Sequence, residues 1–241
     1  WDIEENFGMR LCVIPARGGS KRIPRKNIKE FFGQPIISYS IKVAIASKCF
    51  DRVIVSTDDA EIAEVAKSFG ADIPFMRSKE LSDDFVGTGS VTKHAIEWFE
   101  SHGQAISEVC CIYATAPFVQ ADAIIKAYQQ MTLEKADYCF TVTNFAAPIQ
   151  RAIKITENNR LDMFYPSNYA HRSQDLEDAW HDAGQFYWGK AEAFKQQKII
   201  FSTDSTPYIL PSYLVQDIDT LEDWKRAELM YQILKQVEEI D

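Results

Sequence analysis

The stretch Arg10 to Lys29, RLCVIPARGGSKRIPRKNIK, joins a short apolar run to a basic loop that contains paired glycines. Its first seven residues, RLCVIPA, are almost continuously apolar, which is typical of a strand covered on both faces of a sheet. In α/β proteins, ligands bind beyond the carboxyl ends of such strands. The stretch therefore predicts a buried parallel strand that runs directly into a ligand-binding loop.

Similar apolar runs recur along the chain and alternate with helical patterns. Further strands are expected at Arg52 to Thr57, Glu108 to Thr115 and Asp137 to Thr143. Helices are expected at Pro35 to Lys48, Asp59 to Phe69, Thr88 to Ser101, Ala121 to Met131 and Leu221 to Lys235. Because parallel neighbours need right-handed crossovers, this alternation predicts an α/β fold with a mostly parallel, doubly wound sheet. We expect one domain over residues 9–241.

The segment 148–182 interrupts this alternation. It is rich in Asn, Asp, His and aromatic residues and carries only short strand-like pieces, so we interpret it as an inserted subdomain. The run QFYWG at 185–189 looks like a strand that returns to the sheet. Residues 1–8 carry three acidic residues and no apolar core of a secretory signal, and we interpret them as an artificial or disordered extension before Met9.

The composition excludes several classes of protein. The chain has 241 residues, of which 46% are hydrophobic, enough to fill a sizeable core. A net charge of −9 argues against general nucleic-acid binding. The longest apolar stretch, Val109 to Val119, is far shorter than the roughly 20 residues of a membrane span. The five cysteines form no CxxC pair, which favours buried free thiols in a reducing cytoplasm.

Positive charge is concentrated in residues 17–29, which hold six of the 26 Lys and Arg residues and no acid. Gly18 and Gly19 let backbone amides approach a ligand, and Ser20 adds a hydroxyl. The loop lacks the spacing of a P-loop, and Gly87-Thr88-Gly89 lacks the third glycine of a dinucleotide fingerprint. We interpret the loop as a triphosphate cradle; the alternative is a solvated charged loop.

The run IPARGGSKRIPRKNI at 14–28 resembles the signature of the CMP-acylneuraminate cytidylyltransferase family. The likeness continues through DRVIVSTDD at 51–59, Arg77 with Glu80-Leu81-Ser82, and VQDIDT at 215–220. The runs RSQD at 172–175 and HDAGQFYW at 181–188 look most like the branch of this family that acts on pseudaminic acid.

The resemblance implies a Rossmann-like fold of the nucleotide-diphospho-sugar transferase type. It also implies an enzyme that transfers CMP from CTP to the anomeric hydroxyl of a nine-carbon 2-keto sugar acid, releasing pyrophosphate with Mg²⁺, in a bacterial surface-glycan pathway. Members of the family are typically homodimers, so we expect 148–182 to reach toward the partner's site. By motif, the triphosphate ligands are Arg17, Gly18, Gly19, Ser20 and Lys26, the cytidine ligands are Asn27, Arg77 and Thr88, and the metal ligands are Asp217 and Asp219.

Attack on the α-phosphorus relies on positioning and charge neutralisation, a catalytic role suited to Arg17 and Lys26. On a strand, Asp217 and Asp219 would share a face and could hold one hard cation, with a second ion possible. Their spacing alone equally suits a cap for the helix at Leu221, for which Asp219 or Thr220 is a good residue type. Asp217 is also a candidate general base.

The sugar acid needs a partner for its carboxylate. Arg172 is the natural bidentate candidate, and Arg151 is a second. Gln174, Gln185 and Tyr187 are candidates for its acetamido and hydroxyl groups, whereas His171 and His181 are more typical of surface or packing residues.

Two motifs depart from those of sialic acid enzymes. The chain has YATAP at 113–117, where those enzymes commonly show QPTSP, and AGQFY at 183–187, where they show NGAIY. Since both positions lie near the family's sugar pocket, the sugar is expected to differ from sialic acid.

Other functions remain open. One is the same reaction on N-acetylneuraminic acid, legionaminic acid or 3-deoxy-manno-octulosonate, because small polar changes redirect specificity. Another is a non-catalytic nucleotide or polyanion-binding module built on the basic loop, which would not need Asp217 and Asp219.

Overall fold

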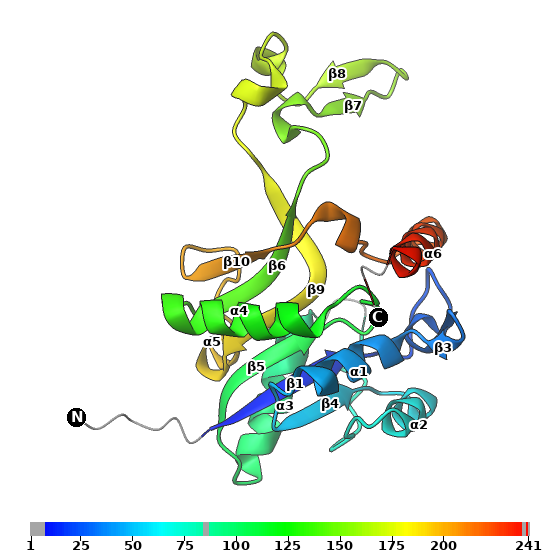
Figure 1. The fold of residues 1–241 in the computed structure, drawn as a ribbon, viewed down its shortest axis with the longest axis vertical. Coiled ribbons are helices and arrows are strands. Elements are labelled where there is room, and N and C mark those ends of the chain that lie inside the picture. The colour runs from blue at the N-terminus through cyan, green and yellow to red at the C-terminus, as the bar shows by residue number, and fades with distance from the viewer. Residues whose placement is uncertain (1–7, 84–86, 238–239, 241) are drawn as a thin grey trace, which may run out of the picture.

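The computed structural model describes residues 8–83, 87–237 and 240, and in these ranges the chain forms a six-stranded sheet with helices on both faces (Figure 1). The strand order is β10-β6-β9-β5-β1-β4. These strands are β1 (Met9–Pro15), β4 (Arg52–Ser56), β5 (Ile106–Ile112), β6 (Tyr138–Asn144), β9 (Trp180–Lys190) and β10 (Ser205–Ile209). The helices are α1 (Ile37–Ser47), α2 (Ala60–Ser68), α3 (Thr88–Ser101), α4 (Ala121–Glu134), α5 (Ala191–Lys195) and α6 (Leu221–Gln236).

The mostly parallel sheet is confirmed, with one strand reversed. β1 pairs in parallel with β4 and β5, and β10 pairs in parallel with β6, but β9 runs antiparallel to both of its neighbours. β9 returns from the end of β6 without a crossover helix, so that Asn144 pairs with Trp180. Two neighbouring strands that are joined at the same edge of the sheet, without a crossover, run antiparallel. The predicted strand at 185–189 is therefore the second half of a longer, reversed strand.

Alternate residues of the central strands face two separate cores. Cys12, Ile14 and Val55 pack in the first core with apolar residues of α1, α2 and α4. Leu11 and Val13 pack in the second with Ile96 and Phe99 of α3 and with α5. Because successive side chains of a strand point to opposite faces, a nearly continuous apolar run is what two helical layers require. All five cysteines are buried free thiols, as expected.

The boundaries differ from the predictions where local turns intervene. Pro35 belongs to the short hairpin of β2 (Glu30–Phe31) and β3 (Gln34–Pro35), so α1 begins at Ile37. Asp59 caps α2 through its side chain and is not part of the helix. The strand β10 was not predicted; it lies at the sheet edge, where Pro207 is tolerated.

Residues 145–179 lie outside the six-stranded sheet, between the ends of β6 and β9, and project away from it in Figure 1. They contain the two-stranded sheet of β7 (Ile153–Ile155) and β8 (Leu161–Met163) and three short 3₁₀ helices, η2 (Ile149–Arg151), η3 (Pro166–Asn168) and η4 (Ser173–Asp175). Residues 180–182, at the end of the predicted insertion, belong to β9. We call residues 145–179 the projecting segment.

Two further expectations concern the N-terminal residues and membrane-spanning helices. The interpretation of residues 1–8 falls outside the described residues, apart from Gly8. Among the described helices, none combines the length and the apolarity needed to cross a bilayer.

Candidate active site

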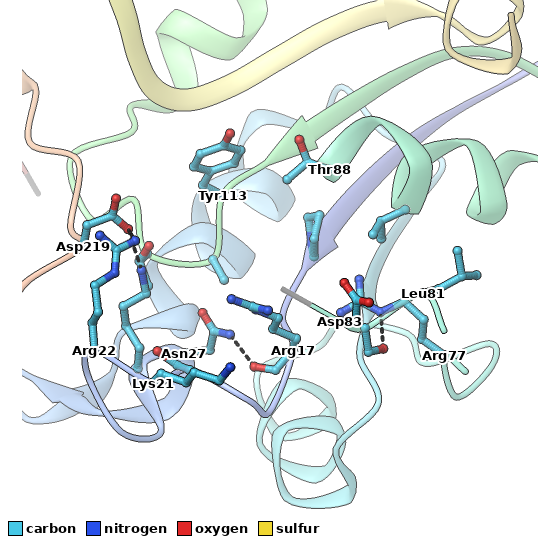
Figure 2. A pocket seen from close by; sticks show the side chains of 17 residues that line it. Arg17, Lys21, Arg22, Asn27, Arg77, Leu81, Asp83, Thr88, Tyr113 and Asp219 are labelled. Atoms are coloured by element: carbon cyan, nitrogen blue, oxygen red, sulfur yellow. Dashed lines mark hydrogen bonds and ion pairs between the residues drawn. The ribbon is translucent and has the colours of Figure 1, made fainter. Parts of the chain in front are cut away.

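A cavity of about 470 Å³ opens at the carboxyl ends of the adjacent strands β1 and β5 (Figure 2). Its wall comes from five parts of the chain: the basic loop after β1, residues 77–83, the start of α3, residues 113–115 after β5, and Asp219 before α6. The carboxyl edge of a parallel sheet is where ligands bind in α/β proteins, because the loops that follow the strands converge there. The cavity lies where the sequence predicts a ligand-binding site.

Many of the residues proposed from the sequence meet in this cavity. Its lining includes Arg17, Ser20, Lys26, Asn27, Arg77, Thr88 and Asp219. Lys21 and Arg22 of the same loop also line it. Most of these side chains are cationic or hydrogen-bonding, so the cavity suits a strongly anionic ligand.

Arg77 carries a buried positive charge in the cavity wall. The residue is only 5% exposed, and its Nε donates to the Ser82 hydroxyl at 3.1 Å. Burial lowers the pKa of Arg77, and the positive charge of Arg17 lowers it further, whereas Asp58 acts in the opposite direction. Two cations that disfavour each other in this way would be stabilised by an anion between them.

Lys26 connects the basic loop to the loop before α6. Its Nζ donates to the Ile218 carbonyl at 2.6 Å and lies 3.4 Å from Asp219 Oδ1. Arg22 lies 3.2 Å from the same carboxylate oxygen. Lys26 is the first residue of the 3₁₀ helix η1 (Lys26–Ile28), and the side chain of Asn27 donates to the Arg17 carbonyl at 2.9 Å. These bonds hold the loop in a curved form around the cavity.

Asp217 and Asp219 lie in a loop, so the expectation that they share the face of a strand is wrong. The capping alternative is also excluded for them, because Thr220 is the N-cap of α6 and forms a capping box with Asp223. Neither carboxylate therefore caps the helix. Asp219 lines the cavity, while the carboxyl of Asp217 lies against Gly184.

The environment of Asp217 disfavours the ionised form of its carboxyl group. Although the residue is exposed, partial burial of its carboxyl raises its pKa, and the negative charge of Asp219 raises it further. In the described part of the chain, His, Cys, Asp and Glu form no group of three or more that could hold a metal. A divalent cation held by these two carboxylates would need phosphate oxygens or water as its other ligands, which is the usual coordination of Mg²⁺ at a nucleotide. The residues fit such a shared site.

Comparison with known proteins decides the family. The family described as Cytidylyltransferase matches residues 11–238. The chain belongs to the cytidylyltransferase family. This cytidylyltransferase is 48% identical to the pseudaminic acid cytidylyltransferase of Campylobacter jejuni subsp. jejuni serotype O:2, over 92% of its own length and 96% of the relative's. The resemblance found in the sequence is confirmed.

More distant similarities also cover most of the chain. The CMP-N,N'-diacetyllegionaminic acid synthase of Legionella pneumophila is 29% identical, over 92% of this chain and 96% of the relative. The solved structure of CMP:2-keto-3-deoxy-manno-octonic acid synthetase complexed with CTP superposes with a TM-score of 0.65 at 18% identity, covering 93% of this chain and 99% of the other. At that identity the likeness establishes the fold alone.

Gly18 shapes the basic loop of the cytidylyltransferase. Its N–H donates to Asp58 Oδ1 at 2.9 Å, so this amide is already bonded within the protein. A Cβ at Gly18 would lie 2.7 Å from Asp59 Oδ2, which leaves no room for a side chain. Around Gly19, by contrast, a Cβ would meet no described atom within 4 Å. The first glycine allows close packing against Asp59, the N-cap of α2, and the second adjoins open space.

Gln185 and Tyr187 lie in β9, behind the wall of the cavity. Gln185 is 3% exposed and donates through Nε2 to the Leu214 carbonyl at 2.6 Å. Tyr187 is 5% exposed, and its hydroxyl donates to Asp182 Oδ2 at 2.5 Å. Among the described residues, the aromatic side chain that lines the cavity is that of Tyr113, which stands in the sequence only as a departure from sialic acid enzymes. Its position directly after β5, equivalent to that of Arg17 near the end of β1, was the signal.

Arg172 and Gln174 lie in the projecting segment and not among the residues that line the cavity. Arg172 is exposed and forms a bidentate pair with Asp175, at 2.8 and 3.1 Å. Arg151, the second candidate, ends η2 in the same segment. Within one copy of the chain, therefore, these side chains are not brought together with the basic loop.

The ion pair of Asp59 with Arg25 is expected to stabilise the loop and the fold. The guanidinium lies 2.6 Å from Asp59, and its hydrogen bond lowers the pKa of Asp59 to about 2. We expect Asp59→Asn, which retains a good N-cap, to lower the free energy of unfolding by about 1 kcal/mol at pH 7, after allowing for partial exposure. Urea unfolding measures the change.

The pH dependence follows from the sign of this shift. A depressed pKa stabilises the fold above the unfolded value of about 3.9, and this contribution is lost as the pH falls toward about 2. The difference between wild type and Asp59→Asn should therefore be smaller at pH 3 than at pH 7. Glu61→Gln removes an exposed carboxylate from the same guanidinium and should cost less. A pH-independent difference would contradict the ion-pair interpretation.

Proposed function

We propose that this cytidylyltransferase transfers CMP from CTP to pseudaminic acid and releases pyrophosphate, with Mg²⁺ as the metal. Identity of 48% over nearly the full length of both chains supports the choice of sugar. The observation that carries the reaction is the convergence of Arg17, Lys26, Arg77 and Asp219 on one cavity at the carboxyl edge of the sheet. A triphosphate needs such a set of cations, and a metal-bound nucleotide needs the carboxylate.

In this proposal the anomeric oxygen of the sugar acid attacks the α-phosphorus of CTP in line. A new bond forms between that oxygen and the phosphorus, the bond from the α-phosphorus to the bridging oxygen breaks, and pyrophosphate leaves with the negative charge. Arg17, Ser20 and Lys26 would hold the phosphates, with Gly19 beside them. Arg77, Asn27 and Thr88 would hold the cytidine. The main contribution of the protein is to fix the two reactants and offset charge.

Asp217 and Asp219 would hold Mg²⁺ together with phosphate oxygens. The bound ion would supply charge neutralisation at the phosphates. Partial burial and the charge of Asp219 raise the pKa of Asp217, which makes its carboxylate a stronger base than an ordinary aspartate. We therefore retain Asp217 as the candidate that accepts the proton of the anomeric hydroxyl.

We further propose that the projecting segment packs against a second copy of the chain and brings Arg172 to that copy's cavity. Exposed apolar side chains on the segment support this: Ile153, Ile155, Leu161, Phe164, Tyr165 and Tyr169. Apolar groups gathered in this way are typical of a surface that is covered by a partner.

Arg172→Ala is expected to raise KM for the sugar acid at least tenfold, because a bidentate charged contact is lost, while KM for CTP stays within twofold. Steady-state kinetics with each substrate varied in turn measures this, and light scattering gives the oligomeric state. Arg160→Ala, an exposed arginine on the same segment, is the control. Equal loss of CTP binding, or a monomeric and fully active enzyme, would contradict the proposal.

The deciding experiment is pyrophosphate release by purified protein with CTP and Mg²⁺. Pseudaminic, legionaminic and N-acetylneuraminic acids and 3-deoxy-manno-octulosonate are each offered, with ATP, GTP and UTP as nucleotide controls. We expect release with CTP and pseudaminic acid. Preference for another acid would support the proposed reaction and contradict pseudaminic acid as its substrate. CTP binding without release for any acid would favour the non-catalytic alternative, whose binding would be salt-dependent and metal-independent.

A further inference from the structure

Arg25 differs from most basic residues of the loop in its position and in its backbone conformation. Of the six basic residues at 17–29, four line the cavity, Arg17, Lys21, Arg22 and Lys26, whereas Arg25 and Lys29 are not among the lining residues. The backbone of Arg25 lies in the left-handed region, at φ 56° and ψ 31°. A side chain makes that conformation unfavourable, so the surrounding structure must hold it in place.

The conformation of Arg25 decides where the next two residues lie. Arg25 is the N-cap of η1, and its carbonyl accepts from the Ile28 N–H at 3.0 Å. The first two residues of η1 are Lys26 and Asn27, which both line the cavity. Because the backbone rotates mainly about φ and ψ, a change of these angles at Arg25 would move Lys26 and Asn27 together.

Two carboxylates hold the guanidinium of Arg25. It forms a bidentate pair with Asp59, at 2.6 and 2.9 Å, and its Nη2 also lies 2.5 Å from Glu61 Oε2. Asp59 is itself fixed, because its Oδ1 accepts from the Ile62 N–H at 3.0 Å as the N-cap of α2. Since a bidentate pair has a defined geometry, Arg25 attaches the loop to the start of α2 in one orientation.

Lys26 has its partner in a different part of the fold. Its ammonium donates to the Ile218 carbonyl, shortly before α6, whereas Arg25 is attached to α2, and these two helices lie apart in Figure 1. The start of η1 is therefore held by adjacent side chains that bind to separate elements. A cation that is fixed before the ligand arrives loses little conformational freedom on binding, and it meets the phosphates in the required place.

We infer that Arg25 is a positioning residue, whose ion pairs with Asp59 and Glu61 hold the backbone in the left-handed conformation and so direct Lys26 to the phosphates of the nucleotide. Its own charge is bound by the two carboxylates and not by the ligand. The inference rests on the proposed function for the identity of the nucleotide, and it adds a residue that acts only through its neighbour in the chain.

The test measures the dissociation constant of CTP by calorimetry, on the full-length protein with Mg²⁺ and without a sugar acid. Arg25→Asn removes the guanidinium, and Asn is among the residue types that best tolerate the left-handed region. We expect this variant to bind CTP about tenfold more weakly. In the background of Lys26→Ala, the same substitution should weaken binding less than twofold, because the residue through which it acts is then absent.

The double variant Asp59→Asn/Glu61→Gln separates positioning from simple charge. It removes two negative charges near the basic loop, whereas Arg25→Asn removes a positive one. An electrostatic effect on an anionic ligand would therefore have opposite signs in the two variants. Loss of positioning weakens binding in both, and we expect a severalfold weakening in the double variant.

Arg52→Gln is the matched control. Arg52 pairs with Asp72 at 2.7 Å, and its side chain is 39% exposed, the same fraction as that of Arg25. It is the first residue of β4, at the opposite end of the strand from the cavity, and is not among the lining residues. Its loss should leave CTP binding within twofold of the wild type. Thermal unfolding of every variant shows that each is folded at the temperature of the titration.

The outcomes separate the inference from the proposed function. Unchanged CTP binding in Arg25→Asn, or an equal loss in Arg52→Gln, would overturn the positioning role. Tighter binding in the double variant would overturn it in favour of charge, and a full tenfold effect in the Lys26→Ala background would overturn the action through Lys26. If the wild type bound CTP but released no pyrophosphate with any acid, the proposed reaction would fail while these titrations still decided the role of Arg25. A wild type that bound no CTP would overturn both.

Discussion

Lys26→Ala is expected to lower kcat/KM for CTP by about 10²–10³-fold, the usual cost of removing one preorganised charge from a site where charge is redistributed. The ammonium of Lys26 lies between the basic loop and Asp219, and only 19% of its side chain is exposed. A cation in this position is poorly solvated, so its interaction with a triphosphate is weakly screened. Pyrophosphate release measured over a range of CTP concentrations gives the value.

Lys29→Ala is the matched control. It removes the same charge from the same stretch of chain, but Lys29 lies over the ring of Trp224, 4.7 Å from its centroid, and not among the lining residues. Its activity should stay within about threefold of the wild type. Since Lys26 also donates to the Ile218 carbonyl, thermal unfolding of both variants separates a local catalytic defect from a general loss of stability. Equal activity of the two variants would contradict a role for Lys26 in holding the phosphates.

Asp219→Asn is expected to lower kcat by about 10²–10³-fold and to raise the Mg²⁺ concentration needed for half-maximal activity. The substitution keeps the size of the side chain but removes the charge that faces the cavity. It also leaves Arg22 and Lys26, which both lie within 3.4 Å of this carboxylate, without an anionic partner there. CTP binding without metal should therefore be equal to or tighter than that of the wild type.

Glu222→Gln provides the control for this prediction. Glu222 lies three residues farther along, is exposed, and pairs with Arg226 on the surface of α6. Its replacement should leave both the rate and the metal requirement unchanged, because an exposed pair contributes little. Wild-type metal dependence in Asp219→Asn, measured by titration of Mg²⁺ at saturating CTP, would remove Asp219 from the metal site.

Much of the fold follows from patterns that are local in the chain. The run LCVIP is apolar on both sides of the strand because β1 lies inside the sheet, between β5 and β4, and is covered by a helical layer on each face. The direction of β9 could not be predicted from local patterns. Its residues 185–189 read as a buried strand in either direction, and only the return from the end of β6 decides that it runs antiparallel.

The candidate site divides in the same way. Arg17, Ser20 and Lys26 were predictable because they adjoin one strand, in a loop with a density of positive charge that no core position would tolerate. The partner of Lys26 was not, because Asp219 is 193 residues away and its spacing to Asp217 fits a helix cap as well as a metal site. Tyr187 was predicted to face the sugar, whereas the sheet turns its side chain behind Tyr113 and toward Asp182.

The fold class, the position of the basic loop and the family can be read from the chain alone, since they depend on hydrophobic periodicity and on residues that are neighbours along the chain. Which side chains meet at the cavity depends on the folded chain, which brings Asp219 beside Lys26, Arg77 near Arg17, and Tyr113 in front of Tyr187. The physical reason is that the carboxyl edge of the sheet collects loops from distant parts of the chain. Hydrogen bonds and charges there act over a few ångströms of space, whatever the separation in sequence.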